Sequence, residues 1–512
     1  MQLIHHFLER SADLYPEKTA LIHENTRASY TQINSQANIL ARHLLDRGVT
    51  HGDRVVLLME NCPEYVTGYY GILKAGAVAV PLNTGLKPDC LQDLLQDIEP
   101  TILISSSRFE RVLGNIDLND STIRELILKD PHSEWSSTIT TTPWENLISS
   151  DSSPNPVIPI SDSNLANIIF TSGSTGKLKG VMLSHLNMVA NTQSICQYLN
   201  LTADDIQMVV LPFFYVMGKS LLNTHFAVGG TVVINNKFAF TASVLNQMVE
   251  ERVTGFSGVP STYAFLLNRS PLTKYRDRLD SLRYCSQAGG HMSRTTKMEL
   301  RESLPTHTQI YIMYGATEAS ARLSYLDPDK FTDKIDSIGK AIPGVNLRVL
   351  DKSGEAVEAG EIGELVASGP NIMQGYWRDH EATAKVLDNG TYHTGDMAYQ
   401  DDEGFFYLVG RNDDMIKTGG HRVNPLEIED TLMDSGLLME AVVLGVPDKL
   451  LGRRLAALVT PKNLECDEKE ILRYCALKLP KHKVPGTIKL TRNIPKSETG
   501  KIDRARCRLE MK

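Results

Sequence analysis

The sequence lacks any apolar run of the roughly 18 residues that a membrane-spanning helix needs. Its first residues, MQLIHHFLERSADLYPEK, contain no basic segment followed by an apolar core, so we expect no secretory signal. The seven cysteines are scattered and form no CxxC pair, which disfavours a disulfide framework or a zinc site. His5 and His6 have no partners at metal-ligand spacing, and we expect a surface pair there. We therefore expect a cytoplasmic protein with reduced thiols and no membrane span.

The chain also lacks the excess of positive charge that is typical of nucleic-acid binding, because its net charge is −8 at pH 7. The charge is unevenly distributed, with a net +5 over residues 411–512 and a net −13 over residues 1–410. We expect no nucleic-acid partner. The basic C-terminal part could meet an acidic or phosphorylated partner, or it could be an ordinary solvated surface.

What the sequence does contain is a dense cluster of glycines, hydroxyls and lysines at residues 171–180, TSGSTGKLKG, directly after the apolar run 167–170. Glycines let consecutive backbone N–H groups point at an anion, and hydroxyls and lysines add donors and charge. The spacing is not that of a Walker loop, because Thr171 and Leu178 stand where that motif has Gly and Ser or Thr. A phosphate-binding loop of another type is favoured over a flexible surface turn.

The order of apolar segments predicts an α/β protein built from βαβ units. Residues 3–50 look mainly helical, and residues 63–75 predict a further helix. Residues 136–163 are rich in Ser, Thr, Asp, Asn and Pro and predict a surface connection. Buried strands are expected at residues 54–59, 78–80, 101–104, 167–170, 207–211, 231–234, 283–287 and 309–313.

Two smaller regions follow this large α/β part. From residue 345 the elements shorten, with strands expected at 347–350 and 363–366, which indicates a small β-rich region. After residue 411 the pattern predicts an α+β domain, with strands at 441–446 and 455–459 and a helix at 468–479.

Four more motifs follow the loop in order: YGATE at 314–318, YHTGD at 392–396, GRNDDMIK at 410–417 and PKSETGKI at 495–502. Together with residues 171–180 they resemble the adenylate-forming superfamily, which includes acyl- and aryl-CoA synthetases, adenylation domains of peptide synthetases and beetle luciferases. Each motif alone could be a turn or a polar loop. Five motifs in order over about 330 residues make those readings improbable, and the resemblance extends over nearly the whole chain.

The resemblance implies a domain organisation. Residues 1–410 would form the adenylating domain, residues 411–413 a hinge that includes Asp413, and residues 414–512 a small mobile domain that carries the catalytic Lys501. In the family, this domain rotates between two half-reactions.

The resemblance also implies which residues contact the nucleotide. The phosphate loop would contribute Thr171, Ser172, Gly173, Ser174, Thr175, Gly176 and Lys179. Thr317 and Glu318 would act at the reacting phosphate, and Glu318 would help to hold Mg²⁺. Adenine would lie between Gly289, Gly290 and the Tyr314–Gly315 segment, and Asp396 would accept hydrogen bonds from the ribose, supported by Arg411.

The sequence is less specific about which residues bind the acid and the thiol. Phe214, Tyr215, Gly218 and Val259 are candidates for an acyl pocket, although core packing is an alternative for some of them. No acidic residue occurs at 211–228, so an α-amino acid, whose ammonium would need a counter-charge, is disfavoured. Leu178 replaces the family's usual proline, and we expect a small effect. Gly419 and Gly420 would leave room for a pantetheine arm.

The expected activity is ATP-dependent activation of a carboxylic acid to an acyl-adenylate, followed by thioester formation with CoA. The alternative acceptor is the phosphopantetheine of a carrier protein. The basic C-terminal part would suit an acidic carrier protein. A nucleotide-binding scaffold without catalysis is a third possibility, disfavoured because Glu318, Asp396 and Lys501 are all in place.

Overall fold

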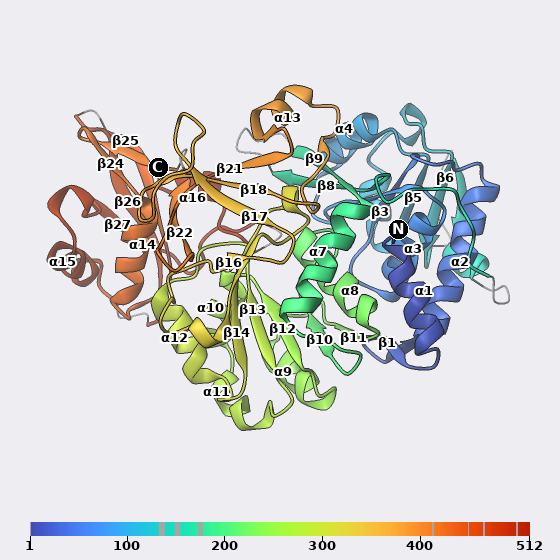
Figure 1. Ribbon diagram of the computed structural model, residues 1–512, viewed down its shortest axis with the longest axis horizontal. Helices are drawn as coiled ribbons and strands as arrows, with labels where there is room; N and C mark the ends of the chain where they lie inside the picture. Colours follow the sequence, from blue (N-terminus) through green and yellow to red (C-terminus); the bar gives the residue numbers. More distant parts are fainter. Residues whose placement is uncertain are drawn as a thin grey trace.

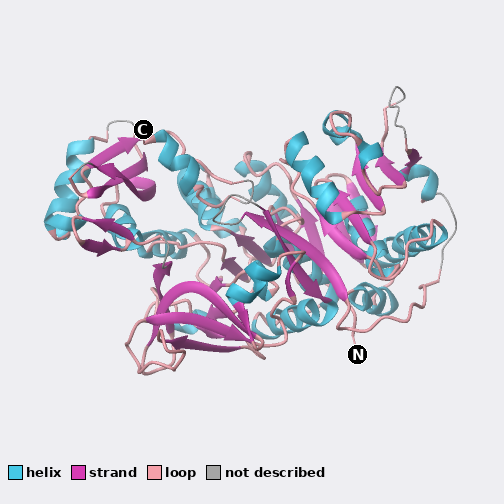
Figure 2. Ribbon diagram, turned by 90° about the horizontal axis from the view of Figure 1, so that it is seen from above, coloured by secondary structure: helices cyan, strands magenta, loops and turns pink. Residues whose placement is uncertain are grey.

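The structure is a computed structural model that describes residues 2–132, 139–148, 154–172, 178–411, 414–448, 450–463, 466–497 and 500–511. Within these ranges, no helix has the length and apolar character that crossing a membrane would require. Figure 1 shows a large body formed by the N-terminal four-fifths of the chain, and a smaller C-terminal domain at one end. Figure 2 shows the same division from above.

The first sheet of the large domain has eight strands in the order β19-β9-β8-β4-β3-β5-β6-β7. Its central strands are short, apolar and parallel; Val55, for example, lies between Ala79 and Ile102. Strands of this kind are buried on both faces. The strands are β3 (Arg54–Leu58), β4 (Val78–Pro81), β5 (Ile102–Ser106), β6 (Glu125–Lys129), β7 (Thr140–Pro143), β8 (Leu165–Ser172), β9 (Leu178–Ser184) and β19 (Gly375–Tyr376).

The second sheet has nine strands in the order β16-β15-β14-β13-β12-β10-β11-β1-β2. The strands from β1 to β14 in this order are parallel, and β2, β15 and β16 pair antiparallel at the two edges. The strands are β1 (Thr19–His23), β2 (Thr26–Ser29), β10 (Ile206–Val209), β11 (Thr231–Ile234), β12 (Gly255–Gly258), β13 (Tyr284–Gln287), β14 (Gln309–Tyr314), β15 (Ser324–Leu326) and β16 (Lys340–Ala341).

A layer of helices separates the two sheets, and its side chains join both of them in one core (Figure 1). Helix α2 starts with a capping box between Ser29 and Gln32, and α3 starts with Pro63. The layer consists of α1 (His5–Leu14), α2 (Tyr30–Asp46), α3 (Pro63–Lys74), α7 (His185–Tyr198) and α8 (Val216–Val228). The outer faces are covered by α4 (Pro88–Ile98), α9 (Thr241–Glu250), α10 (Pro260–Arg269), α11 (Leu272–Tyr275) and α12 (Arg294–Ser303).

The β-rich region and the C-terminal domain complete the chain. The first is an antiparallel sheet of β17 (Asn346–Leu350), β18 (Gly363–Ser368), β20 (Leu387–Asp388), β21 (Thr391–Gln400) and β22 (Phe406–Arg411), with α13 (His380–Val386) beside it. The C-terminal domain contains the hairpin β23 (Ile416–Thr418) and β24 (His421–Val423), the sheet of β25 (Leu438–Asp448), β26 (Gly452–Pro461) and β27 (Thr487–Leu490), and the helices α14 (Pro425–Asp434), α15 (Glu468–Lys478) and α16 (Arg504–Glu510). The fold is therefore the expected α/β arrangement.

Several strands were not expected. Residues 3–50 are mainly helical, as expected, through α1 and α2, but they also contain β1 and β2, a hairpin that closes the edge of the nine-stranded sheet. Strand β12, with the sequence GFSG, was not expected at all. A Cβ at Gly255 would stand 2.4 Å from the Tyr284 ring, so glycine is required there by packing and hides the strand from hydrophobic pattern analysis.

Candidate active site

The carboxyl ends of four neighbouring parallel strands deliver most of the residues expected at the site. Tyr215 follows β10, Val259 follows β12, Gly289 follows β13, and Tyr314 ends β14. Because these strands are parallel, their carboxyl ends lie at one edge of the sheet, which is where ligands bind in open α/β sheets. The fold thus gathers residues that are a hundred positions apart in the chain.

The expected phosphate loop joins two paired strands. Thr171 of β8 lies opposite Lys179 of β9 in an antiparallel register, so the loop between them has both ends fixed. Gly173, Ser174, Thr175 and Gly176 fall outside the described residues, as does the side chain of Ser172.

Lys179 and Glu318 are connected through Tyr376, a residue that the sequence did not indicate. The Lys179 ammonium lies 4.8 Å from the centre of the Tyr376 ring, a cation–π distance. The Tyr376 hydroxyl donates a 2.8 Å hydrogen bond to Glu318 Oε1. Burial, and then the Glu318 charge, raise the pKa of Tyr376, so this hydroxyl stays a donor at neutral pH. The contact holds the Glu318 carboxylate to the same tyrosine that Lys179 contacts.

The turn after β14 has a strained backbone. A Cβ at Gly315 would stand 2.0 Å from the Ala321 carbonyl oxygen, so only glycine fits there. The short helix Thr317–Ala319 follows, and Ser320 and Ala321 have positive φ values of 58° and 121°. Such conformations are uncommon for residues with a Cβ and concentrate at functional sites. This turn presents Thr317 and Glu318 at the end of the strand.

A second cluster is formed around the carboxylate of Asp396. Tyr314 donates a 2.5 Å hydrogen bond to Asp396 Oδ2, and Arg411 Nε lies 3.4 Å from Asp396 Oδ1. Asp396 and Arg411 are opposite one another in β21 and β22, which fixes their distance. Burial raises the pKa of Asp396, while the Tyr314 hydrogen bond and the Arg411 charge oppose that rise. The result is an oriented acceptor that is one-fifth exposed.

Lys501 of the C-terminal domain reaches the same region. Its Cε lies 3.4 Å from the position a Cβ would take on Gly289, whose φ is +87°. Its ammonium lies 5.3 Å from the centre of the Tyr215 ring. The residue before Lys501 is also held against the large domain, because Ser261 donates a 2.7 Å hydrogen bond to the Gly500 carbonyl. The lysine therefore meets the carboxyl ends of β10 and β13.

The other candidates lie around this point or on the smaller domain. Phe214 is half-buried, and Val259 is buried at the start of α10. A Cβ at Gly218 would stand 2.2 Å from the Pro212 carbonyl oxygen, so the start of α8 needs glycine there for packing. A Cβ at Gly290 would lie 3.3 Å from Pro260.

The two glycines expected at the thiol channel form the turn between β23 and β24. Gly419 and Gly420 have φ values of 53° and 83°, which favour glycine. A cavity of about 700 Å³ lies beside Gly420, with Lys417 and Arg453 in its lining. Asp413, the expected hinge, lies outside the described residues.

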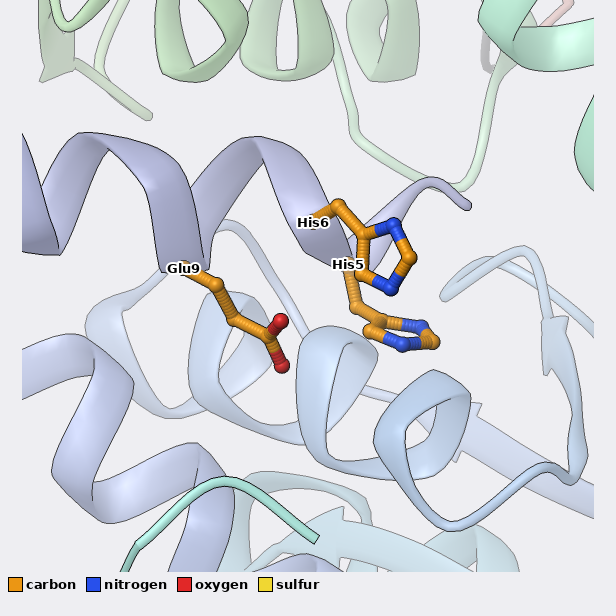
Figure 3. A group of neighbouring side chains, drawn as sticks. All are labelled: His5, His6 and Glu9. Carbon is orange, nitrogen blue, oxygen red and sulfur yellow. The ribbon is translucent and has the colours of Figure 1, made fainter. Parts of the chain in front are cut away.

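One group of side chains in the described part of the chain could hold a metal ion. His5, His6 and Glu9 of α1 have ligand atoms within 4.8 Å of one another (Figure 3). This corrects the expected surface pair, because His5 is only 7% exposed and Glu9 lies within reach. However, the buried Lys74 ammonium already pairs with Glu9 at 2.5 Å, and Leu3 N–H donates to His6 Nδ1. A metal ion would have to displace that ammonium, so we assign the group to packing of α1 on α3.

Comparison with known proteins agrees with this geometry. The profile of the AMP-binding enzyme family matches residues 8–377, and that of the AMP-binding enzyme C-terminal domain matches residues 427–501. A feruloyl-CoA synthase from Amycolatopsis sp is 33% identical over 497 residues, covering 96% of each chain.

Two solved structures are similar over nearly their whole length. The anthranilate CoA ligase AuaEII in complex with anthranoyl-AMP has a TM-score of 0.91 at 26% identity, covering 99% of this chain and 97% of that one. The o-succinylbenzoate coenzyme A synthetase MenE from Bacillus subtilis, in complex with ATP and magnesium ion, has a TM-score of 0.82 at 27% identity and covers 98% of each chain.

The chain therefore belongs to the AMP-binding enzyme family, whose members are ATP-dependent adenylating enzymes. Within that family it is an AMP-forming acid–thiol ligase of the acyl-CoA synthetase type.

Proposed function

We propose that this ligase converts an aromatic carboxylic acid to its acyl-adenylate and then to its CoA thioester, with the site residues in the roles given below. The observation that carries the proposal is the position of Lys501, which brings a positive charge from the C-terminal domain to Gly289 and Tyr215. Two anionic reactants have to meet at this point, and a cation between them offsets their repulsion.

In the first half-reaction, a carboxylate oxygen of the acid attacks the α-phosphorus of ATP, and the bond from that phosphorus to the β-bridging oxygen breaks. The electron pair leaves with pyrophosphate. Two unit charges 4 Å apart repel by about 4 kcal/mol at an effective dielectric constant of 20. Lys501 would offset this repulsion, and Lys179 and the residue 171–180 loop would bind the departing phosphates.

The remaining nucleotide contacts follow from the clusters described above. Asp396 would accept hydrogen bonds from the two ribose hydroxyls, held in place by Tyr314 and Arg411. Gly289 and Gly290 would allow adenine to lie close to the backbone, and Thr317 would contact the α-phosphate.

The donor set at Glu318 fits Mg²⁺. Tyr376 engages one carboxylate oxygen and fixes the other's direction. Mg²⁺ is commonly held by one or two carboxylates together with substrate phosphates and waters, so a single glutamate suffices. When bound, the ion neutralises phosphate charge.

In the second half-reaction, the CoA sulfur attacks the acyl carbonyl carbon, the carbon–oxygen bond to the phosphate breaks, AMP leaves, and the thiol proton passes to solvent. The C-terminal domain would turn about residues 411–413, exchange Lys501 for the Gly419–Gly420 turn, and admit the pantetheine arm. Lys417 and Arg453 suit the CoA phosphates. A carrier protein remains the alternative acceptor.

The class of acid is supported by the relatives and by the absence of a counter-charge for an ammonium. Three kinds of similar protein are named for the aromatic compounds feruloyl-CoA, 2-succinylbenzoate and anthranilate, and one, at 29% identity, is named for long-chain fatty acids. No Asp or Glu occurs at 211–228, where an α-amino acid's ammonium would need one.

An ATP–pyrophosphate exchange screen across aryl, fatty and amino acids tests the proposal. We expect exchange with aryl acids and little with α-amino acids. Thioester formation is then measured with free CoA and with a panel of phosphopantetheinylated carrier proteins, and CoA should be the better acceptor. Absence of exchange with every acid would refute acid activation and favour a nucleotide-binding scaffold.

A further inference from the structure

The segment of residues 373–377 joins the turn that carries Glu318 to the end of the phosphate loop. Its first residue, Met373, donates a 2.8 Å hydrogen bond from its N–H to the Glu318 carbonyl. Its last residue, Trp377, donates a 2.7 Å hydrogen bond from its N–H to the carbonyl of Gly180, which closes the loop. The segment is therefore held to both parts of the nucleotide site by its backbone.

Tyr376 of this segment contacts two side chains of opposite charge. Its hydroxyl donates a 2.8 Å hydrogen bond to Glu318 Oε1, and the Lys179 ammonium lies 4.8 Å from the centre of its ring. Tyr376 is only 5% exposed, and its N–H donates to Thr383 Oγ1 at 2.9 Å. Packing and backbone contacts thus fix the ring between its two charged neighbours.

The two charges do not pair with each other. Within the described residues, neither Lys179 nor Glu318 takes part in an ion pair, although both contact Tyr376. A lysine and a glutamate within reach of one another commonly pair, and each then offsets the charge of the other. The tyrosine gives the ammonium a ring face and the carboxylate a hydroxyl, so both keep their charge for a ligand.

We propose that Tyr376 is a positioning residue that orients Glu318 toward Mg²⁺ and keeps Lys179 from neutralising that carboxylate. The inference rests on the proposed function, because it concerns the same nucleotide site. Without the tyrosine, Lys179 would be free to pair with Glu318, and both charges would be lost to the nucleotide. Groups that orient a metal ligand typically account for about 10- to 100-fold in metal affinity.

The test measures binding of α,β-methylene-ATP, in which a methylene group replaces the oxygen of the bond that breaks. Isothermal titration calorimetry gives its Kd with Mg²⁺ and with EDTA, and we expect tighter binding with Mg²⁺ in the wild type. In Tyr376→Phe, which keeps the ring, this gain should fall by about 10-fold, with the Kd in EDTA unchanged. In Tyr376→Leu it should fall by about a further 3-fold, because Lys179 then pairs with Glu318.

Combined variants separate positioning from a general structural effect. In a Glu318→Gln background, Tyr376→Phe should cause no further loss, because the hydroxyl acts through the carboxylate. Adding Lys179→Met to Tyr376→Leu should restore the further loss that the leucine causes. Tyr407→Phe is the matched control, since the Tyr407 hydroxyl donates to Asp401 Oδ2 at 3.1 Å and its removal should leave the gain from Mg²⁺ unchanged.

Three results would each overturn the inference: a gain from Mg²⁺ that is absent in the wild type or unchanged in Tyr376→Phe, a Tyr376→Phe loss that adds in full to that of Glu318→Gln, or a Tyr376→Leu loss no larger than that of Tyr376→Phe. If Tyr376→Leu does not fold, Tyr376→Met takes its place. No acid is present in these measurements. They are therefore independent of acid activation, whose failure shows as no pyrophosphate exchange with any acid.

Discussion

At the scale of single residues, the site depends on side chains that arrive from different parts of the chain and hold one another in place. Asp396 is oriented by Tyr314 and Arg411, and Glu318 is oriented by Tyr376. Lys501 differs, because it belongs to the C-terminal domain and contacts the large domain at Gly289 and Tyr215. Its contribution should therefore be separable from theirs.

We predict that Lys501→Ala abolishes adenylate formation and spares thioester formation from pre-made acyl-AMP. Removing one charge-stabilising group typically costs about 100-fold or more in rate. Pyrophosphate exchange measures the first half-reaction, and CoA-dependent consumption of acyl-AMP measures the second. Lys496→Ala is the control, since the Lys496 ammonium pairs with Glu440 at a distance of 2.7 Å, whereas that of Lys501 faces the Tyr215 ring. Equal losses in both half-reactions would contradict the assignment.

The sequence predicted Tyr314, Asp396 and Lys501 as site residues because each of them lies in one of the five motifs. It could not indicate Tyr376, which lies outside the five motifs and reaches Glu318 only because β19 pairs with β9. It also could not indicate that Lys219 of α8 is completely buried against Tyr65, because burial is a property of the packed helix layer and leaves no pattern in the chain.

At the scale of elements, hydrophobic patterns predicted eight of the seventeen strands of the two large sheets, most of them central and parallel, because parallel buried strands are continuously apolar. They failed at β1 and β2, which lie among the helices of residues 3–50, and at the glycine-containing β12. The metal-spacing argument failed for His5, because it considered the sequence next to the pair and not the face of α1 that turns Glu9 toward it.

Helix α12 offers a prediction about pH. Burial lowers the pKa of Lys297 from its ordinary 10.5 to about 8. Between these values the unfolded chain binds a proton that the folded chain does not, so the free energy of unfolding rises with pH across this window. At pH values below 8 the folded protein bears the whole free-energy cost of burying the charged amine. The free energy of unfolding of Lys297→Met, relative to wild type, should thus fall by about 3 kcal/mol between pH 7 and pH 10.5.

Urea denaturation at intervals across this range measures the difference. Lys352→Met serves as the control, because Lys352 is exposed and its replacement should give no such slope. A difference between Lys297→Met and wild type that does not change with pH would show that the amine titrates normally.

At the scale of the whole molecule, the two domains meet through α10 and α12. Thr295 donates a 2.6 Å hydrogen bond to Asp434, His291 lies 2.7 Å from Asp430, and Lys462 lies 2.6 Å from Glu299. These contacts accompany the approach of Lys501, so they belong to the arrangement that we assign to adenylation.

Linking the domains in this arrangement should separate the half-reactions. We predict that the double variant Thr295→Cys, Asp434→Cys, once oxidised, retains pyrophosphate exchange and loses thioester formation by at least ~10-fold, because in the proposed mechanism the second step requires the domain to turn. Reduction should restore the loss, and each single variant should behave as wild type. Undiminished thioester formation in the oxidised protein would exclude domain rotation from the mechanism.

The contacts between the domains have a consequence for the conditions under which the enzyme works. The pairs His291–Asp430 and Lys462–Glu299 are partly exposed, with at least a quarter of each side chain accessible, and dissolved salt weakens exposed pairs. At low ionic strength the small domain would stay longer over the large one, and at high ionic strength it would leave sooner. If the domain turns as proposed, the electrolyte around the enzyme would help to set the interval between making the adenylate and passing its acyl group to the thiol.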